Sequence, residues 1–317
     1  MALSPEAVRD QLTGVFAFPV TPMNVDGSLN EEQLRRHVRF LLESGAAAMF
    51  ACGGTGEFFS LSLDEYRRAV AAVVDEVGGR MPVIAGTGYS TPIAIEFARA
   101  AERLGADGLL VLPPYLVQPE QEGLYRHYRA IAEKVGIGLI LYHRDNAVFA
   151  PETVARLAEL PNVIGFKDGH GNLELFGRIR LKLGDRLSWM NGMPTAEMTF
   201  PAFYALGARA YSSAIANFIP HVTMRFYQAV VGGDRATTAA ILADVIEPLC
   251  RVRDRRKGYA VSYVKAAMFL MGLPDPDGPG PVRPPLIDLE APHREELLRA
   301  LQAILEHYPR PGLHLRT

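Results

Sequence analysis

Eight short apolar runs alternate with helical patterns along the first two thirds of the chain, and this alternation constrains the fold most. The runs are rich in Val, Ile, Leu and Ala, and helical periodicity follows each of them. They span residues 14–20, 46–53, 81–88, 107–113, 136–142, 162–168, 187–192 and 208–213. Strands that are apolar on both faces are typical of a parallel sheet covered by helices. Eight repeats in about 215 residues predict an α/β fold, a (β/α)8 TIM barrel.

The segments between the runs carry helix start and stop signals. Ser62 and Glu65 form a capping-box pattern, and the helix that they open should end at Gly78. Thr91-Pro92 predicts a cap with a first-turn proline. An open doubly wound sheet is the alternative fold, but it needs a Gly-rich phosphate turn after the first strand, where residues 21–28 have none.

The pattern changes after residue 213, where helical segments and a proline-rich crossing replace the strands. We therefore predict a barrel domain over residues 1–225 and a C-terminal helical extension over residues 226–317. The basic run 251–257, "RVRDRRK", is expected to be a solvated helix end rather than a ligand site.

Charge and cysteine content exclude several classes of protein. With 33 Lys and Arg against 35 Asp and Glu, the net charge of -2 gives no reason to expect nucleic acid or an anionic membrane as partner. Two cysteines, Cys52 and Cys250, form neither a disulfide framework nor a four-thiolate zinc site. The sequence has no secretion signal and no run of about 18 apolar residues, so we expect a cytoplasmic protein.

Candidate chemistry lies at three predicted strand ends, because barrel active sites form at the carboxyl ends of the strands. One strand ends on Tyr142, the next on Lys167, and another leads into "GGTGE" at 53–57. Alternation puts Val163 and Gly165 on the face of Lys167, and Gly138 and Ile140 on that of Tyr142. The two glycines are expected to leave space beneath the pair.

These side chains together support covalent chemistry on a carbonyl. Burial lowers the pKa of a lysine, and the neutral amine can form a Schiff base. A phenol beside it can carry the proton. Glycine backbone and the Thr55 hydroxyl would seat a carboxylate. Each part also has a structural interpretation: Lys167 as a strand-end charge, Tyr142 as a core aromatic, and residues 53–57 as a tight turn.

The chain resembles the family of lysine-dependent aldolases and dehydratases that includes dihydrodipicolinate synthase and N-acetylneuraminate lyase. Five motifs carry this resemblance over essentially the whole chain. They are "FPVTPMNVDGSLN", "GGTGEFFSLSLDEY", "PPYLVQPEQEGLYRHY", "LYHRDNA" and "GFKDGHGN". Within the family, the pairing of "GGTGEFFSL" with "YHRDN" and "GFKDG" is most similar to the branch that dehydrates and decarboxylates 5-dehydro-4-deoxyglucarate.

The resemblance implies a role for each matching residue. Lys167 would be the Schiff-base lysine, Tyr142 the proton-transferring phenol, and Thr55 with the backbone at Gly54 the seat of the carboxylate next to the keto group. Tyr115 matches a tyrosine that the synthases lend across a subunit interface. Gly54 stands where many members have a second threonine, which breaks the usual tyrosine–threonine–tyrosine relay.

Two further departures follow Tyr142. Ala147 stands where the synthases have a carboxylate-binding arginine, so Arg144 becomes the candidate for the distal carboxylate, with a solvated pair to Asp145 as the alternative. His143 stands where this branch is expected to have asparagine. At the ends of the last two predicted strands lie Asn191, Gly192, Ser212 and Ser213, some of which we expect to contact substrate.

The resemblance also implies a small keto sugar acid as substrate, no metal or organic cofactor, and a homodimer or homotetramer. Three other functions stay open. A class I retro-aldolase on a related 2-keto-3-deoxy sugar acid, or a synthase-like condensation, would use the same Lys167 and Tyr142. A metal-dependent barrel enzyme would need acidic or histidine ligands at several strand ends. A non-catalytic keto acid binding protein would keep the barrel without the reaction.

Overall fold

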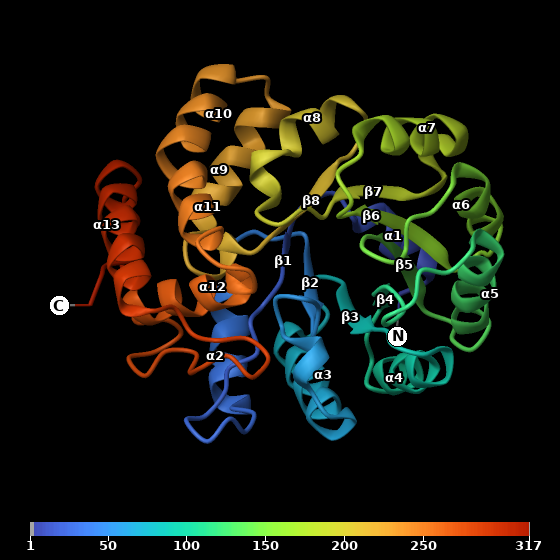
Figure 1. Cartoon of the computed structure of the whole chain (residues 1–317), viewed down its shortest axis with the longest axis horizontal. Coiled ribbons are helices and arrows are strands. Elements are labelled where there is room, and N and C mark those ends of the chain that lie inside the picture. The colour runs from blue at the N-terminus through green and yellow to red at the C-terminus, as the bar shows by residue number, and fades with distance from the viewer. Residues whose placement is uncertain (1–2, 317) are drawn as a thin grey trace.

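The computed structural model describes residues 3–316, and within them the chain forms a closed barrel of eight parallel strands in sequential order (Figure 1). The predicted TIM barrel is confirmed. The strands are β1 (Gly14–Ala17), β2 (Ala48–Ala51), β3 (Val83–Thr87), β4 (Gly108–Val111), β5 (Gly138–His143), β6 (Val163–Asp168), β7 (Ser188–Asn191) and β8 (Ala210–Ser213). Each lies inside one predicted run and is shorter than it at one end or both, except β5, which also takes in His143.

Helices cover the outside of the barrel and bury the outer face of each strand. They are α2 (Glu31–Leu42), α3 (Leu63–Val77), α4 (Thr91–Arg103), α5 (Gln121–Ala132), α6 (Pro151–Ala158), α7 (Leu173–Leu183), α8 (Phe200–Ala205) and α9 (Pro220–Val231). The capping box of Ser62 and Glu65 forms at the start of α3, and Gly78 ends that helix in the left-handed conformation. The N-cap of α4 is Ser90 rather than the predicted Thr91, whose hydroxyl bonds instead to Nδ1 of His127 at 2.8 Å.

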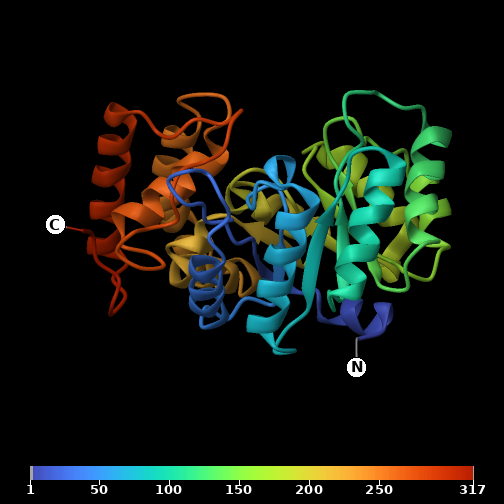
Figure 2. The same cartoon turned by 90° about the horizontal axis from the view of Figure 1, so that it is seen from below.

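Helix α1 (Pro5–Gln11) covers the amino-terminal end of the barrel (Figure 2). Its Val8, with the following Leu12, packs into the inner core beside Phe16 and Phe50. Aromatic and branched side chains fill the barrel interior below the mouth, as in other TIM barrels. One end of the cylinder is therefore sealed, and the opposite mouth is open to ligands.

The remaining helices pack beside β1 and β8, at the left of Figure 1. They are α10 (Arg235–Ile241), the π-helical turn η5 (Leu242–Ile246), α11 (Glu247–Arg253), α12 (Tyr259–Leu270) and α13 (Ala291–His307). A second apolar core joins them to α9 and the barrel through Phe218, Phe226, Val245 and Tyr263. The boundary predicted after residue 225 falls inside α9, and residues 1, 2 and 317 of the predicted parts lie outside the described residues. The division into two parts stays a prediction.

No helix within residues 3–316 combines the length and the apolar character that crossing a bilayer requires.

Candidate active site

Strands β5 and β6 place Tyr142 and Lys167 side by side at the open mouth of the barrel, where they are register partners. The Lys167 Nζ lies 3.6 Å from the centroid of the Tyr142 ring. Both groups point at the Gly192 carbonyl, to which the phenol donates at 3.3 Å and the amine at 3.5 Å. Both side chains are buried. The pair that alternation predicted is thus present.

The surroundings shift the protonation of both groups. Burial is the largest influence on Lys167 and lowers the pKa of its ammonium, and the nearby Arg144 charge acts in the same direction. Burial would raise the pKa of the Tyr142 phenol, but the charges of Lys167 and Arg144 and their hydrogen bonds outweigh it, so the net direction is down. The site thereby favours a neutral amine beside an acidic phenol.

The space expected beneath this pair is filled. The pairing of β5 with β6 shifts by one residue between Leu139 and Ile140, so the alternation along β6 is broken at its start. Ile164 therefore faces the barrel interior while Val163 faces the helices. A Cβ on Gly138 would lie only 2.3 Å from the Ile164 Cδ1. The prediction that Val163 shares the face of Lys167 is wrong, and Gly138 makes room for a side chain rather than for a ligand.

The turn at residues 53–57 forms another wall of the site. Gly54 is exposed, Thr55 is half-buried, and both line the same cavity as Lys167. Cys52 and Glu57 flank the turn with φ of 50° and 54°, a left-handed conformation that is unusual for side chains with a Cβ. Surrounding contacts must hold the turn in this shape.

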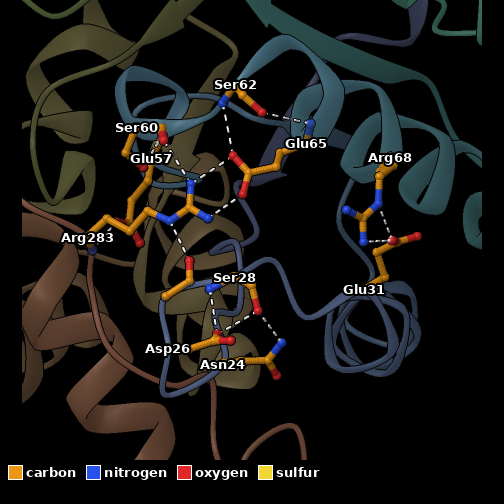
Figure 3. A network of polar contacts seen from close by, with 11 residues as sticks. Asn24, Asp26, Ser28, Glu31, Glu57, Ser60, Ser62, Glu65, Arg68 and Arg283 are labelled. Carbon is orange, nitrogen blue, oxygen red and sulfur yellow. Dashed lines mark hydrogen bonds and ion pairs between the residues drawn. The ribbon is translucent and has the colours of Figure 1, made fainter.

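Those contacts come from α12 and from Arg283, which lies in the segment between α12 and α13; Figure 3 shows the contacts of Arg283. The Glu57 carboxylate is fully buried and pairs with the Lys265 Nζ of α12 at 2.6 Å. It also accepts the backbone N–H of Arg283 at 2.9 Å. The Arg283 guanidinium donates to the carbonyls of Gly27 and Ser60 and to the carboxylate of Glu65. We call Glu57, Lys265 and Arg283 the clamp.

Arg144 and His143, which are adjacent in sequence at the end of β5, take different roles. The Arg144 guanidinium donates to the Tyr142 phenol oxygen at 3.0 Å and to Asp145 at 3.1 Å, and it lines the cavity. His143 points the other way, into the helix layer, where its ring packs against Phe149 and Phe166. Burial lowers the pKa of His143 to about 3, so the imidazole stays neutral.

The cavity at the mouth has a volume of about 330 Å³ and brings together some, but not all, of the predicted residues. Gly192 and Ser212 line it. Asn191 is buried behind the wall, where its amide donates to Ala196 and Thr199 and accepts from Met193. Ser213 is also buried, and it donates to Glu197 at 2.6 Å.

Tyr115 does not reach the cavity of its own chain. Its side chain is 70% exposed and belongs to a separate hollow with Tyr89, Val117 and His127. The neighbouring Leu116 and Val117 are exposed as well. A contribution of Tyr115 to the site would require a second chain.

Several residues that line the cavity could not be predicted from the sequence, because they come from distant parts of the chain. Thr195 follows β7, Arg253 ends α11, and Tyr263 belongs to α12. Arg253 lies in the basic run that was expected to be solvated, yet its side chain is only 17% exposed. The other arginines of that run do pair on the surface, for example Arg251 with Glu247. Only the proximity of "NGMPTAE" to the end of β7 could have pointed to Thr195.

Within residues 3–316, no three His, Cys, Asp or Glu side chains gather as ligands for a metal ion. Cys52 and Cys250 are both buried and free. The chemical groups that meet at the cavity are an amine, two phenols, hydroxyls, backbone, two guanidinium groups and the Asp145 carboxylate, which pairs with Arg144. They suit nucleophilic attack on a carbonyl with nearby proton transfer.

Comparison with known proteins gives one family. Residues 11–304 match the Dihydrodipicolinate synthetase family. A probable 5-dehydro-4-deoxyglucarate dehydratase of Rhizobium meliloti is 48% identical over 303 residues, which cover 95% of this chain and 99% of the relative. A protein of the same description from Streptomyces griseus subsp. griseus is 45% identical and covers 98% of this chain and 99% of its own.

Solved structures agree with this assignment. Dihydrodipicolinate synthase from Oceanobacillus iheyensis superimposes with a TM-score of 0.87 at 26% identity and covers 93% of this chain and 97% of its own. The chloride-inhibited synthase from Acinetobacter baumannii, solved in complex with pyruvate, gives a TM-score of 0.82 at 33% identity, covering 92% and 98%.

Proposed function

The chain belongs to the dihydrodipicolinate synthetase family, and from this premise we propose that it is a 5-dehydro-4-deoxyglucarate dehydratase working through a Schiff base on Lys167. One observation supports the chemistry above all others. A buried amine lies 3.6 Å from a phenol ring at the carboxyl ends of two adjacent barrel strands. The relatives of the same description, 45% to 48% identical over nearly their whole length, support the substrate.

The first steps use the keto acid end of the substrate. Neutral Lys167 attacks the C5 carbonyl, and loss of water gives an iminium. The adjacent carboxylate sits on the turn at Gly54 and Thr55. The Tyr142 phenolate, stabilised by Arg144, takes a proton from C4. The resulting enamine expels the C3 hydroxyl, which leaves as water with a proton from Tyr142.

The same iminium then accepts a second electron pair. It is now conjugated through C4 and C3, so the C1–C2 bond can break and carbon dioxide departs. Protonation at C4, tautomerisation of the C2 enol and hydrolysis release 2,5-dioxopentanoate and restore Lys167. Overall the dianion takes up one proton and yields a monoanion, water and carbon dioxide. One covalent electron sink serves both bond cleavages, so we propose that no metal or organic cofactor takes part.

A direct assay tests this proposal. The protein is supplied with 5-dehydro-4-deoxyglucarate, and carbon dioxide release and aldehyde formation are followed, with Lys167→Ala as control. We expect equimolar gas and aldehyde from the wild type and neither from the variant. Release of pyruvate instead would identify a retro-aldolase, and an unchanged mass of Lys167 after keto acid and borohydride would identify a non-catalytic binder.

We also propose a homodimer or homotetramer in the cytoplasm. The exposed Tyr115, Leu116 and Val117 form an apolar segment beside a hollow, which suits contact with a second copy. The reducing cytoplasm suits Cys52 and Cys250, which are buried and unpaired. Light scattering of the purified protein measures the assembly, and a monomer at micromolar concentration would contradict it.

A further inference from the structure

The wall of the cavity formed by Thr195, Arg253 and Tyr263 has polar groups that the reaction scheme does not use. We call these three residues the far wall. They come from the loop after β7, the end of α11 and the start of α12, so none belongs to the strand ends that carry Lys167 and Tyr142. The far wall and the strand ends enclose one continuous cavity.

Arg253 is held in place but keeps donors free. Its Nη1 donates to the Pro194 carbonyl at 3.0 Å, and its Nε and Nη2 donate to Asp254 at 2.7 and 2.8 Å. A guanidinium has five N–H groups, so two have no protein partner within residues 3–316. Asp254 lies toward solvent, with 63% of its side chain exposed. Water screens that pair, and the guanidinium keeps attraction for an anion in the cavity.

Two buried hydroxyl groups beside it lack partners. The Thr195 Oγ1 and the Tyr263 phenol oxygen make no well-aligned hydrogen bond with any group in residues 3–316, although the Thr195 hydroxyl lies close enough to the Tyr263 phenol and the Cys250 thiol to affect the pKa of both. Thr195 is 5% exposed and Tyr263 is 1% exposed, so bulk water does not satisfy them either. Leaving such groups unpaired is costly. A ligand that reached this wall would therefore offer these hydroxyl groups hydrogen-bond partners.

The backbone of Thr195 points to the same conclusion. Its φ of 47° is left-handed, which is unfavourable for a β-branched residue. The preceding carbonyl, Pro194, is the one that Arg253 holds. Strain of this kind is retained where the surrounding structure enforces it, often at ligand sites. The loop thus holds Thr195 in the wall of the cavity.

We propose that the far wall binds the second carboxylate of the substrate, with Arg253 as its cation and the hydroxyls of Thr195 and Tyr263 as further donors. The proposal rests on the proposed function, because the substrate of that reaction is a dicarboxylate. The proposal also assigns different roles to the two arginines of the cavity. Arg144 donates to the Tyr142 phenol and serves proton transfer, which leaves Arg253 for the carboxylate that departs as carbon dioxide.

The acidic neighbour of the far wall does not prevent this. Glu197 is fully buried and accepts hydrogen bonds from Ser213 and Thr223 on one oxygen. Burial raises the pKa of Glu197, which favours its uncharged form. An uncharged carboxyl does not repel a bound carboxylate.

Two keto acids that differ only in the far carboxylate test the proposal. The protein is incubated with 2-oxoadipate or with 2-oxohexanoate, and borohydride trapping on Lys167 is measured by mass against keto acid concentration. For the wild type we expect half-saturation at a concentration about tenfold to hundredfold lower for the diacid, the range for a hydrogen bond to a charged group. Arg253→Met should remove this preference, and trapping with 2-oxohexanoate should stay unchanged.

Matched variants give the controls. Arg251→Met alters an exposed arginine of the same helix and should keep the preference, whereas Arg253→Lys should keep part of it because the charge remains. Tyr263→Phe should reduce the preference severalfold with little change in shape.

Three results would overturn the inference. The first is a wild type that traps both acids equally well. The second is a preference for the diacid that persists in Arg253→Met and disappears in Arg144→Met. Either result would contradict the role of the far wall but not the proposed Schiff base on Lys167. The third is that neither acid is trapped on Lys167, which would contradict both the proposed function and this inference.

Discussion

At the scale of single residues, burial and the neighbouring aromatic groups act on the pKa of Lys167 in opposite directions. Its amine lies over the Tyr142 ring and 5.3 Å from the centroid of the Phe18 ring. These aromatic faces and the Tyr142 phenol favour the charged form, but burial is the stronger influence and lowers the pKa. Alternation along two strands was enough to predict this pair, because both residues lie in regular β-structure above the shift in pairing.

The lowered pKa predicts how imine formation depends on pH. Trapping with pyruvate and cyanoborohydride should reach half of its plateau below pH 10.4, the ordinary pKa of lysine, because the lowered pKa makes the neutral amine available at lower pH. Peptide mapping should find the adduct on Lys167 and not on the exposed Lys134. An inflection at the ordinary lysine value would show that the site does not shift this amine.

Tyr142→Phe should separate proton transfer from imine formation. Removal of the phenol is expected to lower kcat by about 10²- to 10⁴-fold, the usual contribution of a general acid or base. Borohydride trapping of Lys167 should continue, because the amine remains. Tyr125→Phe, on the outer helix α5, is the matched control and should leave kcat unchanged. Equal loss of trapping and turnover in Tyr142→Phe would assign the phenol to imine formation instead.

At the scale of elements, the clamp ties the turn at residues 53–57 to α12 and to the segment between α12 and α13. The Lys265 ammonium of α12 meets the Glu57 carboxylate where neither side chain reaches water. Arg283 crosses from Glu57 to Glu65, and its hydrogen bonds lower the pKa of Glu65 to about 2. The turn at residues 53–57, which we propose as the carboxylate seat, thus contacts residues more than 200 positions away in sequence.

Lys265→Met should destabilise the protein by about 3–5 kcal/mol, because it leaves the buried Glu57 carboxylate without its cation. Urea unfolding measures this loss. The double variant Glu57→Gln, Lys265→Met should recover much of it, since it removes both charges together.

A second pair provides the comparison for that experiment. Lys182 and Glu152 are paired at 3.2 Å on the surface, so Lys182→Met should cost no more than about 1 kcal/mol. If Lys265→Met and Lys182→Met lowered the free energy of unfolding equally, the buried pair of the clamp would stabilise the protein no more than the surface pair does.

The difference between local patterns and tertiary contacts explains which features could be predicted from the sequence. Strands and helices follow local periodicity, so the barrel, the capping box at Ser62 and the neighbouring positions of Tyr142 and Lys167 were predictable, although β5 and β6 each continue one residue beyond the predicted end. The shift beside Ile164 was not, because Val163 and Ile164 are both apolar and alternation alone cannot choose between them. The far wall and the clamp arise from tertiary contacts that leave no local pattern.

At the scale of the whole molecule, buried histidines set a limit on acid stability. His37 is fully buried, donates one hydrogen bond from Nε2 to the Asn217 Oδ1 at 2.7 Å, and has a pKa lowered to about 4 by burial. An unfolded histidine has a pKa of about 6.5. The unfolded state therefore binds more protons in between, so the stability from neutral His37 is complete above pH 6.5 and is lost as the pH falls toward 4.

Replacement of His37 by Gln should flatten this dependence. Glutamine keeps a donor near the position of Nε2 but does not titrate, so the slope of unfolding free energy between pH 6.5 and 4 should decrease by about 1.4 kcal/mol per pH unit. Urea unfolding at several pH values measures the slope. His307→Gln, at the exposed end of α13, should leave the slope unchanged. An unchanged slope in His37→Gln would place the acid sensitivity elsewhere.

The cavity shared by the strand ends and the helices beyond the barrel has an evolutionary consequence. In the proposed reaction the covalent step uses Lys167 and Tyr142 on two neighbouring strands, whereas the proposed site for the second carboxylate includes residues of helices that follow the barrel strands. Related proteins could therefore come to accept a different sugar acid through substitutions in these helices, while Lys167 and Tyr142 remain unchanged.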